Sequence, residues 1–498
     1  MTAWVLPMPG ASSARRTAWN QIDWSTAEQQ VRRLQMRIAK AIQQGKRGKA
    51  KALQWILTHS FYAKLLAVRR VTQNTGAKTP GIDGVIWTTP GQKYQAATSL
   101  HRRGYQAQPL RRIYIPKKNG KQRPLGIPTM ADRTMQALYL LGLEPIAETT
   151  ADKHSYGFRP ARSTADAIGQ CFLSLCRKTS AQWVLEGDIK ACFDQIDHDW
   201  LIEHIPTDKA VLQQWLAAGY IEKGAFYDTE AGTPQGGIAS PTIANMALDG
   251  LEQIVKQATC PTDKINVIRY ADDFVVTGRS RAILEQRVKP AIVDFLNQRG
   301  LSLSEEKTHI THIDSGFDFL GFNLRKYNGK LLIKPAKKNV KAFLANVRGI
   351  IKSNPTIKTD SLIRLLNPKL RGWANYYRHV VSKATFAKVD TAVFERLCRW
   401  TKRRHPHKSG KWLYGKYFQH PPPNNWWFHA KVRNGNKPLS YFRLFRLATV
   451  KIERHVKIRA QATPFDPAYI GYFDQRKQRR SKRKQAVWNP PKPMGAGS

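Results

Sequence analysis

Residues 268–276 of the chain read Ile268-Arg269-Tyr270-Ala271-Asp272-Asp273-Phe274-Val275-Val276. Apolar, β-prone residues on both sides of a short polar centre predict a β-hairpin with two adjacent carboxylates at its tip. Two such carboxylates repel each other unless a cation lies close to them. Mg²⁺ suits oxygen ligands of this kind and also binds water and phosphate oxygens. On this stretch alone, a solvated turn explains Asp272 and Asp273 equally well, because Asp is common in turns.

A second predicted strand, Trp183-Val184-Leu185-Glu186-Gly187-Asp188-Ile189, places a further acid at its end. Carboxylates from two strand ends can share a pair of divalent ions about 3.5–4 Å apart. Such a pair lowers the pKa of an attacking hydroxyl and stabilises in-line displacement at phosphorus, while the protein supplies position and charge. Asp188, Asp272 and Asp273 are therefore the candidate catalytic residues.

The charge of the chain points to a polyanionic partner. Lys and Arg number 82 against 35 Asp and Glu, a formal net charge of +47 in 498 residues. Each Lys or Arg that contacts a phosphate of nucleic acid releases bound counterions, and this release favours binding. No apolar run reaches the roughly 18 residues that a spanning helix needs, so no membrane partner is expected. The five cysteines are scattered without a Cys-x-x-Cys pair. That arrangement supports neither a disulfide framework nor a zinc site and fits a reducing cytoplasm.

The first part of the chain is expected to be helical after a disordered leader, residues 1–18; an organellar presequence is the alternative interpretation of that leader. Two helices are predicted between Trp19 and Val71, with a break at 43–46. Arg32 and Arg33 lie off the apolar face of the first helix and are candidates for phosphate contacts. A strand at 111–116, a turn at 117–121 and a return strand at 123–128 predict a second hairpin. A helix at about 131–148 and strands at 182–189 and 274–277 follow, which makes the middle of the chain mixed α and β.

After residue 330 the composition changes. Residues 331–498 contain six acids among dense Lys and Arg, interleaved with aromatic residues. Rings can stack on bases while cations hold phosphates, so this region suits a nucleic-acid groove. Packing in a hydrophobic core is the other explanation for the aromatic residues. The basic tail, residues 476–498, is expected to be disordered when it is free.

Eight short blocks follow one another along the chain: Thr79-Pro80-Gly81-Ile82-Asp83-Gly84, Arg123-Pro124-Leu125-Gly126-Ile127-Pro128, Tyr156-Gly157-Phe158-Arg159-Pro160, Asp188-Ile189-Lys190-Ala191-Cys192-Phe193-Asp194, Gly232-Thr233-Pro234-Gln235-Gly236-Gly237, Tyr270-Ala271-Asp272-Asp273, Gly300-Leu301-Ser302-Leu303-Ser304-Glu305-Glu306-Lys307-Thr308 and Phe319-Leu320-Gly321-Phe322. In this order they resemble the motifs of a bacterial group II intron-encoded protein, a reverse transcriptase with maturase activity. The resemblance covers nearly the whole length. Arg371-Gly372-Trp373-Ala374-Asn375-Tyr376-Tyr377 resembles the thumb, or maturase, block of that family.

The resemblance implies an α+β right-hand polymerase, with fingers, a palm built on an antiparallel sheet, and an α-helical thumb. A helical N-terminal extension would precede it and a basic DNA-binding region would follow. The expected boundaries are, in order, 1–18 leader, 19–78 N-terminal extension, 79–330 fingers and palm, 331–425 thumb or maturase domain, 426–475 DNA-binding domain and 476–498 basic disordered tail.

The resemblance also implies roles for single residues. Asp188 and Asp272 would be the main ligands of two Mg²⁺ ions, with Asp273 as a third carboxylate and Ile189 contributing its backbone carbonyl. Phe193 resembles the steric gate, whose ring would clash with a ribose 2′-hydroxyl. Gln235 would contact the incoming nucleotide, and Lys117 and Arg123 would bind its triphosphate. The residues implied to bind nucleic acid are Arg32, Arg33, Arg371, Trp373, Tyr376, Arg403 and Arg404.

The partners implied are the group II intron RNA, target DNA, an RNA template with a DNA primer, and deoxynucleoside triphosphates, in a bacterial cytoplasm. The His-Asn-His endonuclease of many family members, with its Cys-x-x-Cys pairs, is not expected. Two alternatives remain open at this point. The chain could act chiefly as an RNA-binding maturase with polymerase activity secondary, or it could be a CRISPR-associated or diversity-generating reverse transcriptase, which shares the polymerase blocks.

Overall fold

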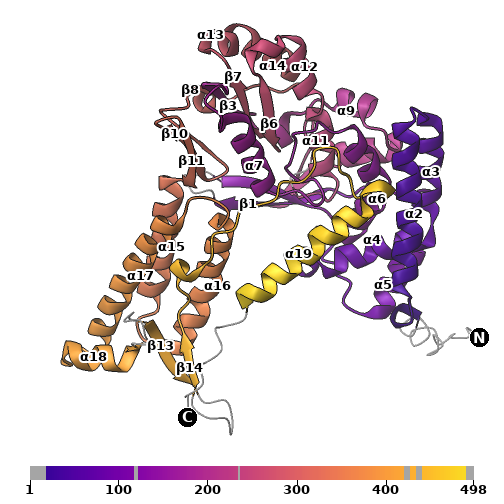
Figure 1. Ribbon diagram of the computed structural model, residues 1–498. Helices are drawn as coiled ribbons and strands as arrows, with labels where there is room; N and C mark the ends of the chain where they lie inside the picture. Colours follow the sequence, from indigo (N-terminus) through magenta and orange to yellow (C-terminus); the bar gives the residue numbers. More distant parts are fainter. Residues whose placement is uncertain are drawn as a thin grey trace, which may run out of the picture. The chain divides into compact units, whose positions relative to one another are not determined.

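The computed structural model describes residues 18–116, 120, 122–233, 236–419, 427–432 and 440–488 (Figure 1), leaving out the side chains of 419 and 482–488. The chain forms two compact units. The first contains Met1–Ala167, Val184–Ile310 and Ile458–Ser481, and the second contains Ile168–Trp183, Thr311–Lys457 and Lys482–Ser498. The expected leader, 1–18, falls outside the described residues except for Ala18. No helix in the described part of the chain is long and apolar enough to span a membrane.

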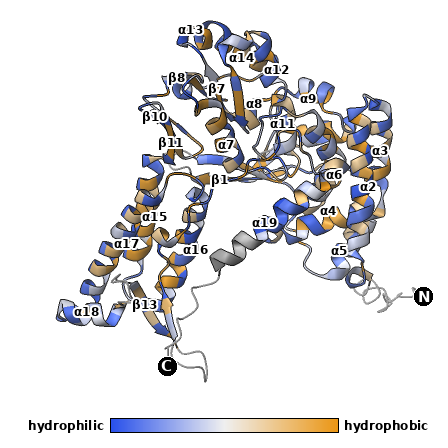
Figure 2. Ribbon diagram, viewed as in Figure 1, coloured by the Kyte–Doolittle hydropathy of each residue, from blue (hydrophilic) through white to orange (hydrophobic). Residues whose placement is uncertain are grey.

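Helices build one side of the first unit. Helices α2 (Trp24–Gln43), α3 (Arg47–His59), α4 (Phe61–Gln73) and α6 (Met130–Thr150) pack against one another (Figure 1). The predicted second helix is therefore two helices, because Ser60 has an extended backbone that ends α3 and caps α4. In Figure 2, α2 and α3 carry both hydrophobic and hydrophilic residues, as amphipathic helices do. Most side chains of α6 are buried, so this helix is the centre of the helical core.

Two sheets lie wholly or mainly in the first unit. One has the strand order β2-β1-β4-β5 and contains the predicted hairpin of β1 and β2, which pair antiparallel. The other has the order β6-β7-β3-β8 and contains the hairpin with the two adjacent Asp residues. The bounds of the strands are β1 Leu110–Pro116, β2 Gln122–Ile127, β3 Trp183–Asp188, β4 Tyr220–Glu222, β5 Ala225–Tyr227, β6 Asn266–Tyr270, β7 Asp273–Gly278 and β8 His309–His312.

Shorter helices precede and connect these strands. Their bounds are α5 Pro90–Thr98, α7 Thr164–Leu175, α8 Cys192–Gln195, α9 His198–His204, α10 Lys209–Leu216, α11 Ser240–Leu248, α12 Leu251–Gln257, α13 Arg281–Ile283 and α14 Lys289–Asn297. The sequence prediction of mixed α and β structure in the middle of the chain is confirmed.

The second unit joins small sheets to a group of basic helices. Strands β9 (Phe317–Phe319), β10 (Phe322–Tyr327) and β11 (Lys330–Pro335) form one sheet. Strands β12 (Phe418–Gln419), β13 (Trp427–Val432) and β14 (Ser440–Arg443) form another. The helices are α15 Lys337–Ser353, α16 Thr359–Tyr377, α17 Lys383–Arg404 and α18 Gly410–Tyr417.

The end of the chain differs from the sequence expectation in two ways. Residues 458–481 belong to the first unit, so the compact units divide the expected domain 426–475. The cause is a return of the chain to α7, where Ile458 N donates to Asp166 Oδ1 at 2.7 Å. Of the tail 476–498 that is expected to be disordered, residues 476–488 instead continue helix α19, Ile470–Trp488, and residues 489–498 lie outside the described residues. Lys, Arg and Gln are good helix formers, and Arg476 pairs with Asp166 at 3.4 Å.

Candidate active site

The tip of the β6–β7 hairpin presents two carboxylates. Tyr270 pairs with Asp273, which leaves Ala271 and Asp272 as a two-residue turn. Ala271 has φ of 59°, in the positive region that short hairpin turns require. Asp272 is half-buried, and Asp273 is exposed at the start of β7. The hairpin predicted from the sequence is confirmed.

Strand β3 brings Asp188 to the same place. Ile189 N donates a hydrogen bond to the carbonyl of Asp272 at 3.3 Å, which joins the end of β3 to the hairpin tip. Gly187 permits the close approach, because a Cβ there would overlap the ring of Phe274. On its other side, the Asp188 carbonyl accepts a hydrogen bond from Ser304 N at 2.8 Å.

The surroundings of Asp272 and Asp273 shift the pKa of both carboxyl groups upward. Burial and the nearby charge of Asp188 raise the pKa of Asp272, against the lowering effect of Arg123 and Lys307. Desolvation and the carboxylates of Asp272 and Asp188 raise the pKa of Asp273 to about 7. The cluster therefore carries more negative charge than its surroundings neutralise.

Lys307, which the sequence analysis did not single out, lies at this cluster. Its Nζ forms an ion pair with Asp188 Oδ2 at 2.7 Å, and this hydrogen bond raises the pKa of Lys307. Lys307 ends the short 3-10 helix Glu305–Lys307, which lies in the block Gly300–Thr308 that resembles a motif of the reverse transcriptase family. The position of Lys307 in that block could have indicated a functional role. Its pairing with Asp188 could not be predicted, because the tertiary fold brings these two residues together.

The side chains at this cluster supply carboxylate oxygens, the type of ligand that divalent cations such as Mg²⁺ prefer. Neighbouring carboxylates raise the pKa of Asp272 and Asp273, and a cation that neutralised this charge would stabilise their ionised forms. Within the described residues, no group of three or more His, Cys, Asp or Glu side chains is arranged so that it could hold a metal ion by itself. A cation that bound the Asp188 carboxylate would compete with the ion pair that this carboxylate forms with Lys307. Mg²⁺ sites commonly take the remaining ligands from water and substrate phosphates.

The residues implied to bind the nucleotide are only partly described. Arg123 lies on β2, and its positive charge lowers the pKa of Asp272, against the larger effect of burial. Phe193 is half-buried on α8, and its carbonyl accepts a hydrogen bond from Thr233 N at 2.6 Å. Ile189 is buried next to Asp188. Lys117 and Gln235 lie outside the described residues.

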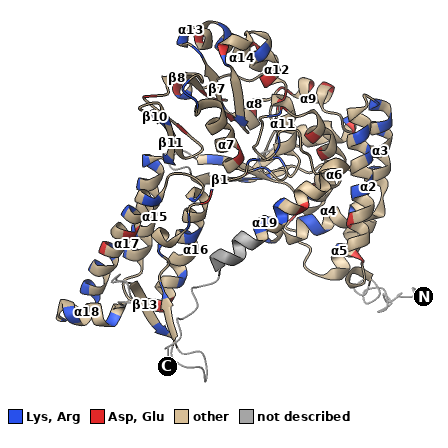
Figure 3. Ribbon diagram, viewed as in Figure 1, with Lys and Arg blue, Asp and Glu red and all other residues tan. Residues whose placement is uncertain are grey.

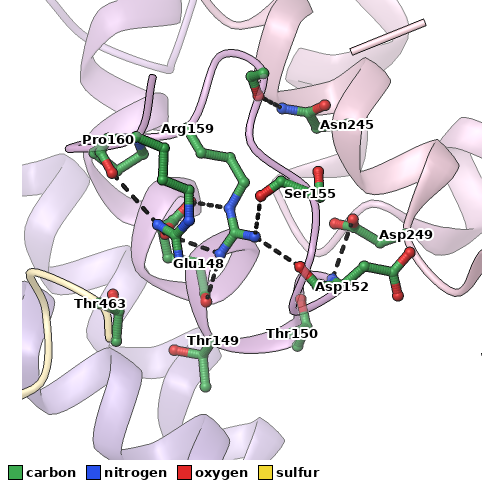
Figure 4. Close-up of polar contacts among 12 residues, drawn as sticks. Glu148, Thr149, Thr150, Asp152, Ser155, Arg159, Pro160, Asn245, Asp249 and Thr463 are labelled. Carbon is green, nitrogen blue, oxygen red and sulfur yellow. Dashed lines mark hydrogen bonds and ion pairs between the residues drawn. The ribbon is translucent and has the colours of Figure 1, made fainter. Parts of the chain in front are cut away.

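A buried ionic network holds the block Tyr156–Pro160 beside the hairpin (Figure 4). Arg159 pairs with Glu148 at 2.7 Å and donates to the carbonyls of Asp152 and Ser155 at 2.8 and 3.0 Å. Tyr156 N donates to the carbonyl of Arg269 on β6 at 2.9 Å. A Cβ at Gly157 would overlap the backbone of Ala271 at the hairpin turn, so this glycine allows the block to pack directly on the tip.

Arg32 and Arg33 are exposed on α2, as their place off the apolar face predicted. Arg33, Arg37 and Lys40 line a surface hollow of about 740 Å³ together with Trp55 of α3. Trp55 is 63% exposed and stacks on His59 with ring centroids 4.2 Å apart. The sequence analysis did not select Trp55, although its place on a basic helix was a usable signal.

The candidate nucleic-acid residues of the second unit have internal partners in most cases. Trp373 stacks on Phe343 with centroids 4.7 Å apart, which agrees with the packing explanation. The Tyr376 hydroxyl donates to the carbonyl of Leu320 at 2.9 Å. Two of the three arginines also have partners within the unit. Arg371 lies over the ring of Phe445, and Arg404 donates a hydrogen bond to the carbonyl of Ile357 at 2.6 Å. Arg403 is exposed.

Comparison with protein families gives three matches in chain order. Residues 19–100 match the N-terminal domain of reverse transcriptase, residues 115–324 match reverse transcriptase (RNA-dependent DNA polymerase), and residues 340–418 match the group II intron maturase-specific domain. The group II intron-encoded protein LtrA of Lactococcus lactis is 30% identical over 410 residues, covering 63% of this chain and 68% of LtrA. The chain belongs to the group II intron-encoded proteins. It is a reverse transcriptase and maturase, and hence an RNA-directed DNA polymerase.

Other relatives of this intron-encoded protein include Protein YkfC of Escherichia coli K12, 34% identical over 300 residues, or 52% of this chain and 79% of YkfC. Among solved structures, telomerase from Candida albicans in complex with a fragment of telomeric RNA matches with 14% identity and a TM-score of 0.35 over 63% of each chain, a score too low to establish a shared fold. Asp188, Asp272 and Asp273 all lie within the matched polymerase residues of the intron-encoded protein.

Proposed function

We propose that Asp188, Asp272 and Asp273 form the catalytic centre for RNA-templated DNA synthesis. The observation that carries this proposal is the convergence of three carboxylates from two neighbouring strand ends, with Arg123 close enough to act on Asp272. When bound there, two Mg²⁺ ions would lower the pKa of the primer 3′-hydroxyl and neutralise charge on the phosphates. The protein holds the two reacting groups in line.

The neighbouring residues have distinct proposed tasks. Arg123 and Lys117 bind the triphosphate, for which the guanidinium of Arg123 gives a forked contact. Gln235 contacts the incoming nucleotide. The ring of Phe193 excludes a 2′-hydroxyl, so the pocket accepts deoxynucleotides. Ile189 contributes its carbonyl beside Asp188.

The proposed architecture is a right-hand polymerase. Residues 79–330 would form fingers and palm, 331–425 the thumb or maturase domain, and 19–78 the N-terminal extension. Residues 426–475 would contact target DNA, with 458–475 packed in the first unit. The basic residues of 476–498 would continue that contact. The polymerase would thereby serve both splicing and insertion of the intron at a DNA target.

The proposed docking site for the intron RNA includes the exposed face of α2 and α3. Arg32, Arg33, Arg37 and Lys40 supply cations there, and Trp55 supplies an exposed ring. This combination suits RNA, because cations hold phosphates while an aromatic face stacks on an unpaired base. In the second unit, Arg403 is the candidate with its side chain most available to phosphate.

Replacing Asp272 with Asn separates the two activities. The substitution keeps the shape of the side chain and removes a charge that a cation requires. Primer extension on an RNA template should fall by about 10³-fold or more, in line with losses seen for catalytic groups. Binding of the intron RNA and assistance to splicing should remain within about twofold of the original protein.

The matched control is Asp199→Asn, an exposed acid in the first turn of α9, which should leave primer extension unchanged. Near-normal DNA synthesis by Asp272→Asn would exclude the proposed metal centre. Absence of DNA synthesis in the unmodified protein, with splicing assistance intact, would favour the alternative function of an RNA-binding maturase.

A further inference from the structure

Phe158 has an unusual backbone for an aromatic residue. Its φ is 58°, in the left-handed region that bulky side chains rarely adopt, and its side chain is 56% exposed. A residue persists in this region only when its surroundings determine the conformation, and such residues gather at functional sites. Phe158 belongs to the block Tyr156–Pro160, to which neither the family matches nor the proposed chemistry gives a task.

Both neighbours of Phe158 are fixed. The carbonyl of Gly157 accepts a hydrogen bond from Asn245 Nδ2 at 2.7 Å, and Asn245 Oδ1 accepts one from Arg269 at 3.0 Å. On the other side, Arg159 is bound by Glu148, whose second oxygen also pairs with Arg162 at 2.7 Å (Figure 4). These buried contacts leave Phe158 little freedom to relax toward a negative φ.

The ring of Phe158 meets the ring of Phe193. Their centroids are 6.1 Å apart with an interplanar angle of 82°, an edge-to-face pair. Phe193 stands on α8, a single turn of four residues that follows Ala191 at φ of 45°. So short a helix fixes a ring weakly. The Phe193 backbone is fixed by Thr233 N, whereas the orientation of its ring depends on side-chain neighbours such as Phe158.

We propose that Phe158 is a positioning residue that holds the Phe193 ring at the sugar of the incoming nucleotide and so sets the discrimination against ribonucleotides. This inference rests on the proposed role of Phe193 as the steric gate. The strained backbone at Phe158 serves to project its ring toward Phe193 from a segment that is itself packed on the Asp272 hairpin. The position of the Phe193 ring therefore depends on the same hairpin that carries the proposed catalytic carboxylates.

The substitution Phe158→Gly tests the proposal and is compatible with the backbone conformation at this position. Glycine adopts a positive φ freely and removes only an exposed ring, so the melting temperature should stay equal or rise. The ratio of kcat/KM for dATP to that for ATP should fall by about two- to tenfold, the range expected for one aromatic pair. Phe158→Asn, which also tolerates this φ, should give the same loss.

A double-variant cycle with Phe193→Val distinguishes positioning from direct contact. Phe193→Val alone should reduce sugar discrimination, and adding Phe158→Gly should then cause no further loss. The control is Phe61→Ala, since Phe61 is an exposed ring in an edge-to-face pair with Tyr94 at the same 6.1 Å separation; it should leave the ratio unchanged.

Three results would overturn the inference, and each has a separate meaning. Unchanged discrimination in Phe158→Gly, with a loss in Phe193→Val, would remove Phe158 and leave the gate. Additive losses in the double variant would show that Phe158 acts independently of Phe193. Unchanged discrimination in Phe193→Val would remove the gate itself, while DNA synthesis that depends on Asp272 would still support the proposed catalytic centre.

Discussion

Single residues with buried charge stabilise strand β6, which leads to the proposed catalytic carboxylates. Glu252 on α12 is 6% exposed and accepts a hydrogen bond from His154 Nδ1 at 3.0 Å and another from Lys256 at 2.5 Å. His154 in turn accepts a hydrogen bond at its carbonyl from Arg269 N on β6. Burial alone would raise the pKa of Glu252, but the hydrogen bonds outweigh it and lower the pKa to about 2.

This lowered pKa makes a prediction about stability and pH. Because Glu252 binds protons less readily when folded, its stabilisation is complete above about pH 4.5 and disappears as the pH falls toward 2. Glu252→Gln should lower the free energy of unfolding by about 3 kcal/mol at pH 7. That difference should shrink between pH 4.5 and the lowest pH at which the protein folds. Urea unfolding at several pH values measures it, and Glu285→Gln, in an exposed pair with Arg281, is the control. A difference that stays constant with pH would contradict the assignment.

At the scale of elements, the β6–β7 hairpin and the block Tyr156–Pro160 act as one packed layer. The contact depends on Gly157, where any Cβ would overlap backbone atoms of Tyr270 and Ala271. Backbone cannot rotate away as a side chain can, so the hairpin tip must move to accommodate the change. Movement of the tip displaces Asp272 from Asp188, and misplacement of about 1 Å can cost about 10²-fold in rate.

Gly157→Ala should therefore affect both stability and catalysis. The free energy of unfolding should fall by about 1–3 kcal/mol, as overpacking does, and primer extension should slow at least about tenfold. Gly349→Ala on α15, where nothing lies within 4 Å of an added Cβ, should leave both unchanged or stabilise slightly. Full activity of Gly157→Ala would mean that the tip tolerates displacement.

The sequence predicted the elements whose signals are local. Alternating apolar residues and a short polar turn were sufficient for both hairpins, and a long apolar period was sufficient for α6. The break at Ser60 was missed because the apolar pattern continues across it. The pairing of Lys307 with Asp188, and of Arg159 with Glu148, joins residues far apart in the chain, and no local pattern encodes such pairs. The acids of the candidate site could be singled out from the sequence because Asp188 ends a recognisable strand and Asp272 and Asp273 lie at the tip of a recognisable hairpin. The positive φ of Phe158, in contrast, arises only from its fixed neighbours.

For the whole molecule, the charge of +47 has to be explained by what it binds. Lys and Arg are spread over α2 and α3 in the first unit and over α15 to α18 in the second (Figure 3). Fewer than half of the chain's cations can be neutralised internally, because the chain has 35 acids for 82 bases. Phosphates of bound nucleic acid are the natural counterions, and each contact releases ions into solution.

Binding of the intron RNA should therefore weaken steeply with salt. Each lost phosphate contact should reduce the slope of log K against log salt by about 0.7–0.9. The double variant Arg33→Ala with Arg37→Ala removes two exposed cations of the α2 surface hollow, and its slope should be shallower by about 1.4–1.8. Filter binding between 50 and 200 mM salt, about the range over which such contacts are lost, gives both slopes. The control is the double variant Arg281→Ala with Arg287→Ala, because these two side chains are paired with Glu285 and Asp263. This double variant should leave the slope unchanged. An equal change in both double variants would mean that total charge, rather than the α2 face, determines binding.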